Sequence, residues 1–405
     1  MIGGAEKVLS YLAGALAAEG AQVSVVTSRP PGLGLAAREE VLVEEAGSGR
    51  RQGVAVSGRL TVVRLSTSRL RFWGTWLYMR NLRRWFEANP VDLAYVSMLK
   101  HDAYVAIGTG RRLGFPVVLR PEGAGATGDI AWQSWGHFGR RIGRRCRAAD
   151  AFVTISKAIE DELRGAWRAG TMRSSRFDRS PAEPRIVSIP NGVPVPAQPW
   201  QRRPDWRAAP RAVFVGRLAP EKGLDTLIDA WPAVRASYPE ARLIVIGEGP
   251  QRPALEARAV AQGLTLGPGQ AVELAGARPE ATAALRDADL FVLPSREEGM
   301  SIALLEAMAL GVPLVASSIP GNRRLVSEFK HGRLTPPDDP AGLARAITEQ
   351  WADFDRAVHM GRAARSRVEQ EFSIRIVARK HLELFQEIVR CTPYAVRSQE
   401  EARHS

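Results

Sequence analysis

The sequence has little of what crosslinks a chain, binds a metal or crosses a membrane. Cys146 and Cys391 are the only cysteines among 405 residues, which argues against a disulfide framework and favours a reducing compartment. The six histidines are scattered, without the spacing typical of a metal site. There is no apolar run of about 18 residues and no secretory signal. We therefore expect a cytoplasmic protein that neither spans a membrane nor is exported by that route.

Positive charge, by contrast, is abundant. Lysine and arginine number 56 against 43 acidic residues, a formal net charge of +13 that comes almost entirely from arginine. Such an excess favours a polyanionic partner or an anionic surface, and nucleic acid is one candidate. The arginines cluster in the first half of the chain, on two predicted helices: Arg69, Arg71, Arg80, Arg83 and Arg84 on one, and Arg140, Arg141, Arg144, Arg145 and Arg147 on the other.

The first of these helices, spanning 69–86, also carries large apolar side chains between its arginines: Phe72, Trp73, Trp76, Leu77, Trp85 and Phe86. One interpretation is a helix that lies on an anionic membrane, which would place the protein peripherally on the inner face of the cell membrane. The other is a helix that buries Trp73, Trp76 and Leu77 in the core and exposes its arginines. The sequence leaves both open.

Strand and helix patterns alternate along the chain, and its length favours two domains. Alternation of this kind predicts an α/β fold built on parallel, doubly wound sheets, which bind ligands at the carboxyl ends of their strands. The predicted strands are 21–27, 60–65, 92–96, 116–119, 151–155 and 185–189 in the first half, then 212–215, 243–246, 271–274, 290–293 and 313–316. The stretch 31–58 has weak periodicity and is interpreted as a mobile excursion.

The segment 297–313 has the features of an anion-binding helix start. It follows the buried strand 290–293; Gly299 interrupts the loop, Ser301 can cap the helix, and Gly311 ends it. Glu298 lies just outside the helix, and Glu306 lies only about 7 to 8 Å beyond the cap at a rise of ~1.5 Å per residue. Two carboxylates thus bracket a helix N-terminus whose free NH groups and dipole suit an anion such as phosphate.

A second segment brings cations to a strand end. The strand 212–215 ends at Gly216 and is followed by Arg217 and Lys222, five residues apart at a helix entrance. Two cations placed in this way suit a diphosphate. Together the two segments closely resemble the nucleotide-sugar domain of the family-4 glycosyltransferases, which have the GT-B fold of two Rossmann-like domains facing a cleft. The resemblance is dense from 211 to 372 and looser before it.

The resemblance implies transfer of a sugar, with retention, from a UDP- or GDP-sugar to a hydroxyl of a glycan or lipid-linked acceptor. It implies neither a metal nor another cofactor, no nucleic acid, and a role in polysaccharide, lipopolysaccharide or glycolipid biosynthesis. Arg217 and Lys222 would neutralise the leaving diphosphate. Glu306 would bind the ribose hydroxyls and Glu298 a hydroxyl of the donor sugar. The backbone of Gly216 and of Gly299, Met300, Ser301 and Ile302 would complete the donor site.

The first domain departs from the family pattern in two places. Gly3 and Gly4 resemble a Gly-Gly pair that lies beside the donor phosphates, but the strand that should precede them is missing. Either the true start lies upstream, which we expect, or the fold does without an inner strand. Glu122, in the glycine-rich loop 120–129, stands near the point where many relatives carry a histidine, and it is our acceptor-side catalytic candidate. His101 is a further candidate to face the cleft. A structural role stays open for both.

The domains we expect are an acceptor-binding domain over 1–193, a proline-rich linker over 194–210 and a nucleotide-sugar domain over 211–371. A helix over 372–390 should cross back to the first domain, and a polar tail should occupy 391–405. Two other functions remain possible: a GT-B sugar epimerase or phosphorylase-like enzyme, and a basic nucleic-acid-binding protein.

Overall fold

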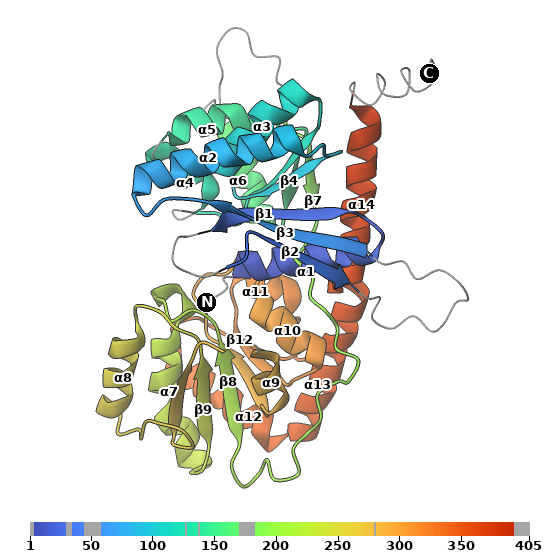
Figure 1. Ribbon diagram of the computed structural model, residues 1–405. Helices are drawn as coiled ribbons and strands as arrows, with labels where there is room; N and C mark the ends of the chain where they lie inside the picture. The colour runs from blue at the N-terminus through green and yellow to red at the C-terminus, as the bar shows by residue number, and fades with distance from the viewer. Residues whose placement is uncertain are drawn as a thin grey trace, which may run out of the picture. The chain divides into compact units, whose positions relative to one another are not determined.

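The computed structural model describes residues 4–29, 35–43, 58–125, 128–136, 138–169, 183–278 and 281–392. The chain divides into two compact units (Figure 1). The C-terminal unit holds Asn191–Ile376 together with Met1–Gly4, and the N-terminal unit holds Ala5–Pro190 and Val377–Ser405. No helix in the described ranges is both long and apolar enough to cross a membrane.

The C-terminal unit is built on one parallel sheet of six strands. Their order across the sheet is β10-β9-β8-β11-β12-β13. The strands are β8 (Arg211–Val215), β9 (Arg242–Ile246), β10 (Val272–Gly276), β11 (Leu290–Leu293), β12 (Leu314–Ser317) and β13 (Arg333–Thr335). The first five confirm the strands predicted here; β13 was not predicted, because its three residues give no apolar run.

Helices cover both faces of this sheet, as the burial of every residue of β11 requires. The helical elements are η1 (Pro220–Lys222), α7 (Leu224–Ser237), α8 (Arg252–Ala261), α9 (Ala281–Arg286), α10 (Ile302–Leu310), α11 (Pro320–Leu325), α12 (Pro340–Ala352), α13 (Phe354–Arg367) and the π-helical turn η2 (Val368–Phe372). The rings of Trp231 on α7 and Trp351 on α12 meet edge to face at 6.4 Å. Continuous apolar strands therefore lie between two helical layers.

The helix predicted after Ser301 is confirmed. Ser301 accepts a hydrogen bond from the NH of Leu304, and Gly311 ends α10 in the left-handed conformation, at φ +87°. α10 is buried on nearly all sides because its sequence is almost wholly apolar. A Cβ at Gly361 of α13 would lie 2.4 Å from the carbonyl oxygen of Gly311, so the two helices touch through backbone.

The N-terminal unit contains two sheets, β1-β3-β2 and β4-β5-β6-β7. Its strands are β1 (Val23–Arg29), β2 (Arg38–Val43), β3 (Gly58–Ser66), β4 (Ala94–Ser97), β5 (Val117–Arg120), β6 (Ala151–Thr154) and β7 (Ile186–Ser188). Its helices are α1 (Gly4–Ala18), α2 (Arg71–Ala88), α3 (His101–Leu113), α4 (Asp129–Trp135), α5 (Gly139–Cys146), α6 (Lys157–Arg168) and α14 (Ile374–Cys391). The predicted alternation of strands and helices is confirmed.

The prediction of a mobile excursion over 31–58 is wrong for residues 38–43. These form β2, which pairs antiparallel with β3, Glu40 opposite Thr61. Its charged residues hid the strand, because an edge strand with an exposed face needs no apolar run. Residues 30–34 and 44–57 lie outside the described ranges. Among the described residues α1 is the first element, and β1 and β4 are each the end strand of a sheet.

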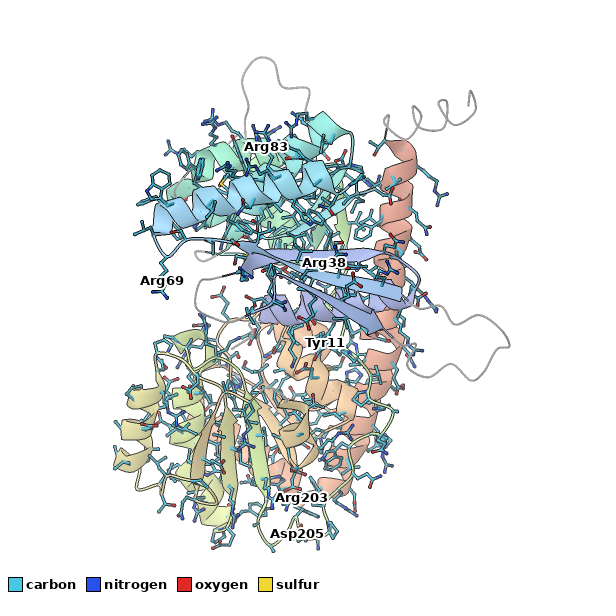
Figure 2. All side chains as sticks on the ribbon, viewed as in Figure 1. Tyr11, Arg38, Arg69, Arg83, Arg203 and Asp205 are labelled. Atoms are coloured by element: carbon cyan, nitrogen blue, oxygen red, sulfur yellow. The ribbon has the colours of Figure 1, made fainter. Side chains whose placement is uncertain are left out.

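Helix α2 is buried at one end and exposed at the other. Its C-terminal half packs into the core through Leu82 and Phe86, which are 4% and 8% exposed. At its other end Phe72, Trp73 and Trp76 are 69%, 63% and 53% exposed, so the predicted burial of the two tryptophans is wrong. Arg69 lies in the segment before α2, not on it, whereas Arg83 lies within the helix (Figure 2).

Helix α14 packs on the β4-β5-β6-β7 sheet. Val377, Leu384 and Ile388 join a buried cluster with Val118 and Val153 of β5 and β6. His381 lies in the same face, where its Nδ1 is 2.8 Å from the carbonyl oxygen of Val377 and its Nε2 is 3.1 Å from the hydroxyl of Tyr95. Since a carbonyl can only accept, the Nδ1–H donates to Val377 and Nε2 accepts from Tyr95.

Candidate active site

In the C-terminal unit, three loops at the carboxyl ends of neighbouring strands contact one another through their main chains. After β8 the NH of Gly216 donates to Ile246, and the NH of Leu218 donates to Glu248. A Cβ at Gly247, where φ is +147°, would lie 1.8 Å from the oxygen of Gly216. Glycine is required there because only bare backbone allows this approach. The β8 and β9 loops are therefore locked together.

The third loop follows β11 and meets the β8 loop at Gly223. This residue has φ +63°, and a Cβ on it would lie 2.2 Å from the carbonyl oxygen of Pro294. The NH groups of Arg296 and Glu297 donate to the carbonyl of Glu221, at 2.8 and 3.4 Å. The predicted donor-site residues of the two segments are thus brought together by contacts between main chains.

Lys222 and Glu298 form an ion pair across these loops. The Nζ–Oε1 distance is 2.7 Å, and the two side chains are 21% and 10% exposed. The hydroxyl of Ser295 donates to the same Oε1 at 3.0 Å. A Cβ at Gly321 would lie 2.2 Å from the carbonyl oxygen of Glu298, so α11 packs against the main chain here. The predicted cation and the predicted carboxylate therefore lie next to each other at the carboxyl ends of the strands.

Arg217 has a different environment. It is 64% exposed and donates to Glu221 at 2.5 Å. Each of the two predicted cations is thus paired with a carboxylate. Lys222 is paired with Glu298 of the β11–α10 loop, and Arg217 is paired with Glu221 of its own loop. A diphosphate that binds here would have to compete with these carboxylates for the two cations, or bind beside the existing ion pairs.

The start of α10 offers backbone donors. In the described part of the chain the NH groups of Gly299, Met300 and Ser301 donate to no protein acceptor. A Cβ added at Gly299 would meet no atom within 4 Å, so the space beside it is open. Ile302, 9% exposed, opens the helix. This is the free helix N-terminus expected of an anion site.

Glu306 is carried one turn into α10 and is only 6% exposed. A carboxylate buried to this extent is costly unless it is hydrogen-bonded. Asn191 braces the loop before the helix, its Nδ2 donating to the carbonyl of Met300 at 3.3 Å. Of the two predicted glycines, Gly3 lies outside the described residues and Gly4 opens α1.

The acceptor-side candidate lies at a strand end of the N-terminal unit. Glu122, two residues after β5, accepts from the Ser97 hydroxyl at 2.5 Å and from Arg120 at 3.2 Å. Its NH donates to Asp129 at 2.7 Å, and Asp129 also accepts from the NH of Leu99. Burial raises the pKa of Glu122 above its ordinary 4.5, although Arg120 and Ser97 oppose the shift.

Sequence reasoning missed Ser97 and Asp129, which fix this carboxyl group. Ser97 is the last residue of β4, and Asp129 ends the loop that follows β5. A polar residue at or after the carboxyl end of a strand is the sequence signal that could have identified them. His101 opens α3, and its ring meets that of Trp132 edge to face at 5.8 Å.

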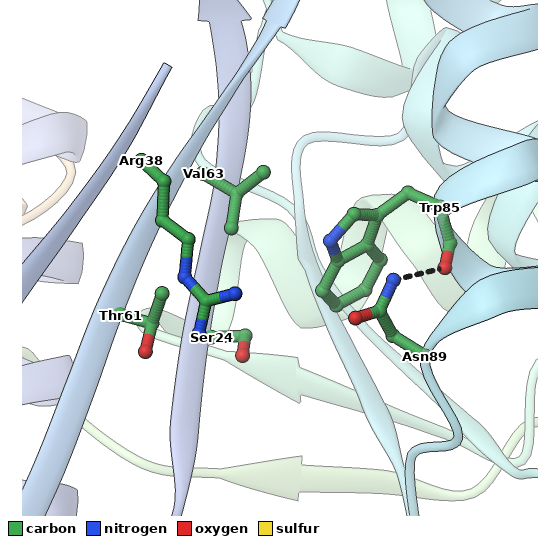
Figure 3. A pocket seen from close by; sticks show the side chains of 6 residues that line it. All are labelled: Ser24, Arg38, Thr61, Val63, Trp85 and Asn89. Atoms are coloured by element: carbon green, nitrogen blue, oxygen red, sulfur yellow. Dashed lines mark hydrogen bonds between the residues drawn. The ribbon is translucent and has the colours of Figure 1, made fainter. Parts of the chain in front are cut away.

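A separate small cavity of about 260 Å³ lies between β1, β2, β3 and α2. Figure 3 shows its lining side chains, Ser24, Arg38, Thr61, Val63, Trp85 and Asn89. Asn89 donates to the carbonyl of Trp85 at 2.7 Å, which closes the helix end. The lining of the cavity comes from the β1-β3-β2 sheet and from α2 with the residue that follows it, and includes none of the predicted site residues. It is not part of the predicted site.

Family models match most of the chain. Residues 2–196 match "Glycosyltransferase Family 4", and residues 209–353 match "Glycosyl transferases group 1". Among curated proteins, glycogen synthase of Mycobacterium tuberculosis is 32% identical over 234 residues, which is 57% of this chain and 53% of that protein. A GDP-mannose-dependent phosphatidylinositol monomannoside mannosyltransferase of the same species is 34% identical over 196 residues, 44% of this chain and 49% of that one. The chain thus spans about half the length of these relatives.

Solved structures share the fold. Sucrose-phosphate synthase from Thermosynechococcus elongatus has a TM-score of 0.71 at 21% identity, covering 95% of this chain and 94% of its own. HepE of Anabaena, solved with UDP and glucose, has a TM-score of 0.61 at 18% identity, covering 80% of this chain and 86% of its own. These neighbours confirm the predicted α/β fold with two Rossmann-like domains. The strand-end loops, the two family models and this shared fold agree, and the chain belongs to the family-4 glycosyltransferases.

Proposed function

We propose that this protein transfers a sugar from a nucleotide diphosphate sugar to a hydroxyl of an acceptor, with retention, in the synthesis of a polysaccharide, lipopolysaccharide or glycolipid. The observation that carries this proposal is the Lys222–Glu298 pair beside the unoccupied NH groups of the α10 start. It offers a cation and backbone donors to a diphosphate, and a carboxylate to a sugar, within one turn of helix.

The residue roles follow from charge and position. Lys222 and Arg217 neutralise the diphosphate as the sugar leaves, together with the α10 NH groups. Glu298 accepts from a donor-sugar hydroxyl, and the more deeply placed Glu306 accepts from the ribose hydroxyls. Two cations and a helix end supply the positive field, so no metal and no other cofactor is required in this scheme.

Glu122 is proposed to act on the acceptor side. Its carboxyl group accepts from Ser97 and Arg120, and its position at the end of β5 suits a contact with an acceptor hydroxyl. A uridine or guanosine donor is in keeping with the names of the relatives, which include a GDP-mannose-dependent enzyme and a protein solved with UDP. The acceptor is proposed to be a glycan or a lipid-linked glycan.

An anionic membrane is the proposed partner of the exposed end of α2. Leu70, Phe72, Trp73 and Trp76 are all more than half exposed. Arg80 lies over the Trp76 ring at 5.5 Å, and Arg83 and Arg84 follow on exposed positions. Apolar rings that can enter the headgroup region, bordered by cations that attract anionic lipid, are what an interfacial helix needs.

Sedimentation with vesicles containing anionic lipid tests this partner. Replacing Trp73 and Trp76 by Ser should abolish co-sedimentation at low salt. Val260→Ser removes an apolar side chain with similar exposure on α8 and should not. Wild-type protein that stays in the supernatant would refute the membrane proposal. That result would leave the proposal for the donor site unaffected.

The transferase proposal is tested by thermal shift with UDP, GDP, ADP and their sugars, followed by product analysis. One nucleoside diphosphate should raise the melting temperature, because only ligands of the native state do so. The matching sugar nucleotide, incubated with a candidate acceptor, should yield a glycoside of the donor's anomeric configuration. Epimerised donor in place of glycoside, or no nucleotide binding at all, would refute the proposal.

A further inference from the structure

Arg296, which no sequence motif singled out, lies between the two loops that carry the donor-site residues. It belongs to the β11–α10 loop, two residues before Glu298. Its guanidinium reaches back to the β8 loop, where Nη1 donates to the carbonyl of Pro220 at 2.6 Å, two residues before Lys222. Its own NH donates to Glu221. The side chain therefore connects the two loops. Its contact with Pro220 lies two residues before Lys222 in one loop, and Arg296 itself lies two residues before Glu298 in the other.

All five NH donors of the guanidinium are used. Besides Pro220, Nη1 donates to Asp225 at 2.9 Å, and Nη2 donates to the other oxygen of Asp225 at 2.8 Å. Nη2 also donates to the Thr226 hydroxyl at 3.4 Å, and Nε donates to Asp338 at 2.6 Å. An arginine has five donors in a fixed fork, and a lysine has three on a flexible stem. The arrangement therefore demands arginine.

These acceptors come from separate elements. Asp225 and Thr226 lie in the first turn of α7, and Asp338 lies in the turn before α12, where its φ of +58° is unusual for a residue other than glycine. The guanidinium is anchored on α7 and on that turn before it reaches Pro220. It therefore fixes the position of the β8 loop relative to the β11–α10 loop.

We propose that Arg296 is the positioning residue that sets the separation of Lys222 and Glu298, and so aligns the diphosphate and sugar subsites of the donor. This inference rests on the transferase function proposed above. Arg296 itself touches neither donor nor acceptor in the proposal. Since an error of about 1 Å in the placement of reacting groups can cost about a hundredfold in rate, its loss should act on transfer more than on nucleotide binding.

The C-terminal unit provides a matched control. Asp229 lies four residues after Asp225 on α7 and forms an equivalent two-pronged pair with Arg258 of α8, at 2.6 and 2.5 Å. Asp225→Asn and Asp229→Asn therefore each weaken one Arg–Asp pair on the same helix by an isosteric change. Only the first pair is connected to the donor loops.

The experiment compares wild type, Arg296→Lys, Asp225→Asn and Asp229→Asn. We expect kcat/KM for transfer to fall about a hundredfold in Arg296→Lys and about tenfold in Asp225→Asn. Affinity for the free nucleoside diphosphate, by calorimetric titration, should fall less than kcat/KM in both. Asp229→Asn should match wild type in both assays, while the melting temperatures of the two Asn variants fall to a similar extent.

Three outcomes overturn the inference in different ways. If wild type binds a nucleotide and transfers sugar, and Asp225→Asn and Arg296→Lys do so equally well, Arg296 is structural. If transfer falls only in proportion to melting temperature, and equally in Asp229→Asn, the effect is on stability and the inference is again wrong. A wild-type protein that binds no nucleotide refutes the proposed function, and the positioning role with it.

Discussion

Replacement of Glu298 by Gln should tighten the binding of the free nucleoside diphosphate while it impairs sugar transfer. In the structure Glu298 holds Lys222 at 2.7 Å, and both side chains are largely buried. The carboxylate is therefore a competitor of the diphosphate for the same cation. Gln keeps the shape and a hydrogen bond to Lys222 but removes the competing charge.

The magnitude follows from the two kinds of hydrogen bond. A hydrogen bond with one charged partner contributes roughly 1.5–3 kcal/mol, and Lys222 keeps such a bond to the amide. The substitution removes the attraction between two unit charges, about 1 kcal/mol at about 4 Å in water, and this is released to the diphosphate. This corresponds to an increase in affinity of about fivefold. Transfer should fall by about tenfold or more, since the sugar hydroxyl loses a charged acceptor.

Calorimetric titration with the nucleoside diphosphate identified by thermal shift measures the first effect, and a transfer assay measures the second. Glu297→Gln is the control, because Glu297 is the exposed neighbour and makes no side-chain ion pair or hydrogen bond within the described ranges. It changes the net charge equally and should leave both quantities unchanged. A tenfold loss of nucleotide affinity in Glu298→Gln would show that Glu298 supports Lys222 and does not compete with its ligand.

Three further results are expected. Glu306→Gln should weaken nucleoside diphosphate binding by about ten- to a hundredfold, because a charged acceptor contributes roughly 1.5–3 kcal/mol to a ribose hydroxyl bond; unchanged titration would remove Glu306 from the site. EDTA should leave most of the transfer activity, and complete loss restored by Mg²⁺ would contradict a metal-independent scheme. Burial lowers the pKa of His381 from 6.5 to about 4. The unfolded chain therefore binds a proton that the native state does not, and as pH falls from 6.5 to 4 the free energy of unfolding should drop by up to about 3 kcal/mol. Denaturation midpoints of His381→Gln should show a weaker pH dependence than those of wild type, and an unchanged dependence would contradict the assignment to His381.

The sequence by itself determined the alternation of strands and helices and the bounds of α10. Local chemistry controls both: an apolar run of four to five residues makes a buried parallel strand, Ser301 caps the helix, and Gly311 adopts the left-handed conformation that ends it. It also predicted the donor-site residues of the two strand-end loops, whose roles stay a proposal. The spacing of these residues within each loop is a property of the chain alone.

Only the tertiary structure decided which charges meet. Lys222 and Glu298 are 76 residues apart, and their pairing depends on how the β8 and β11 loops approach each other. Arg217 and Glu221, by contrast, pair within one loop, four residues apart. The same applies to Arg296, whose acceptors come from three loops and helix ends that no single stretch of sequence brings together. Helix α2 is a further case: the periodicity of its apolar residues fits burial along its whole length. Its first turns nevertheless lie beyond the core, because the elements beneath them cover only its second half.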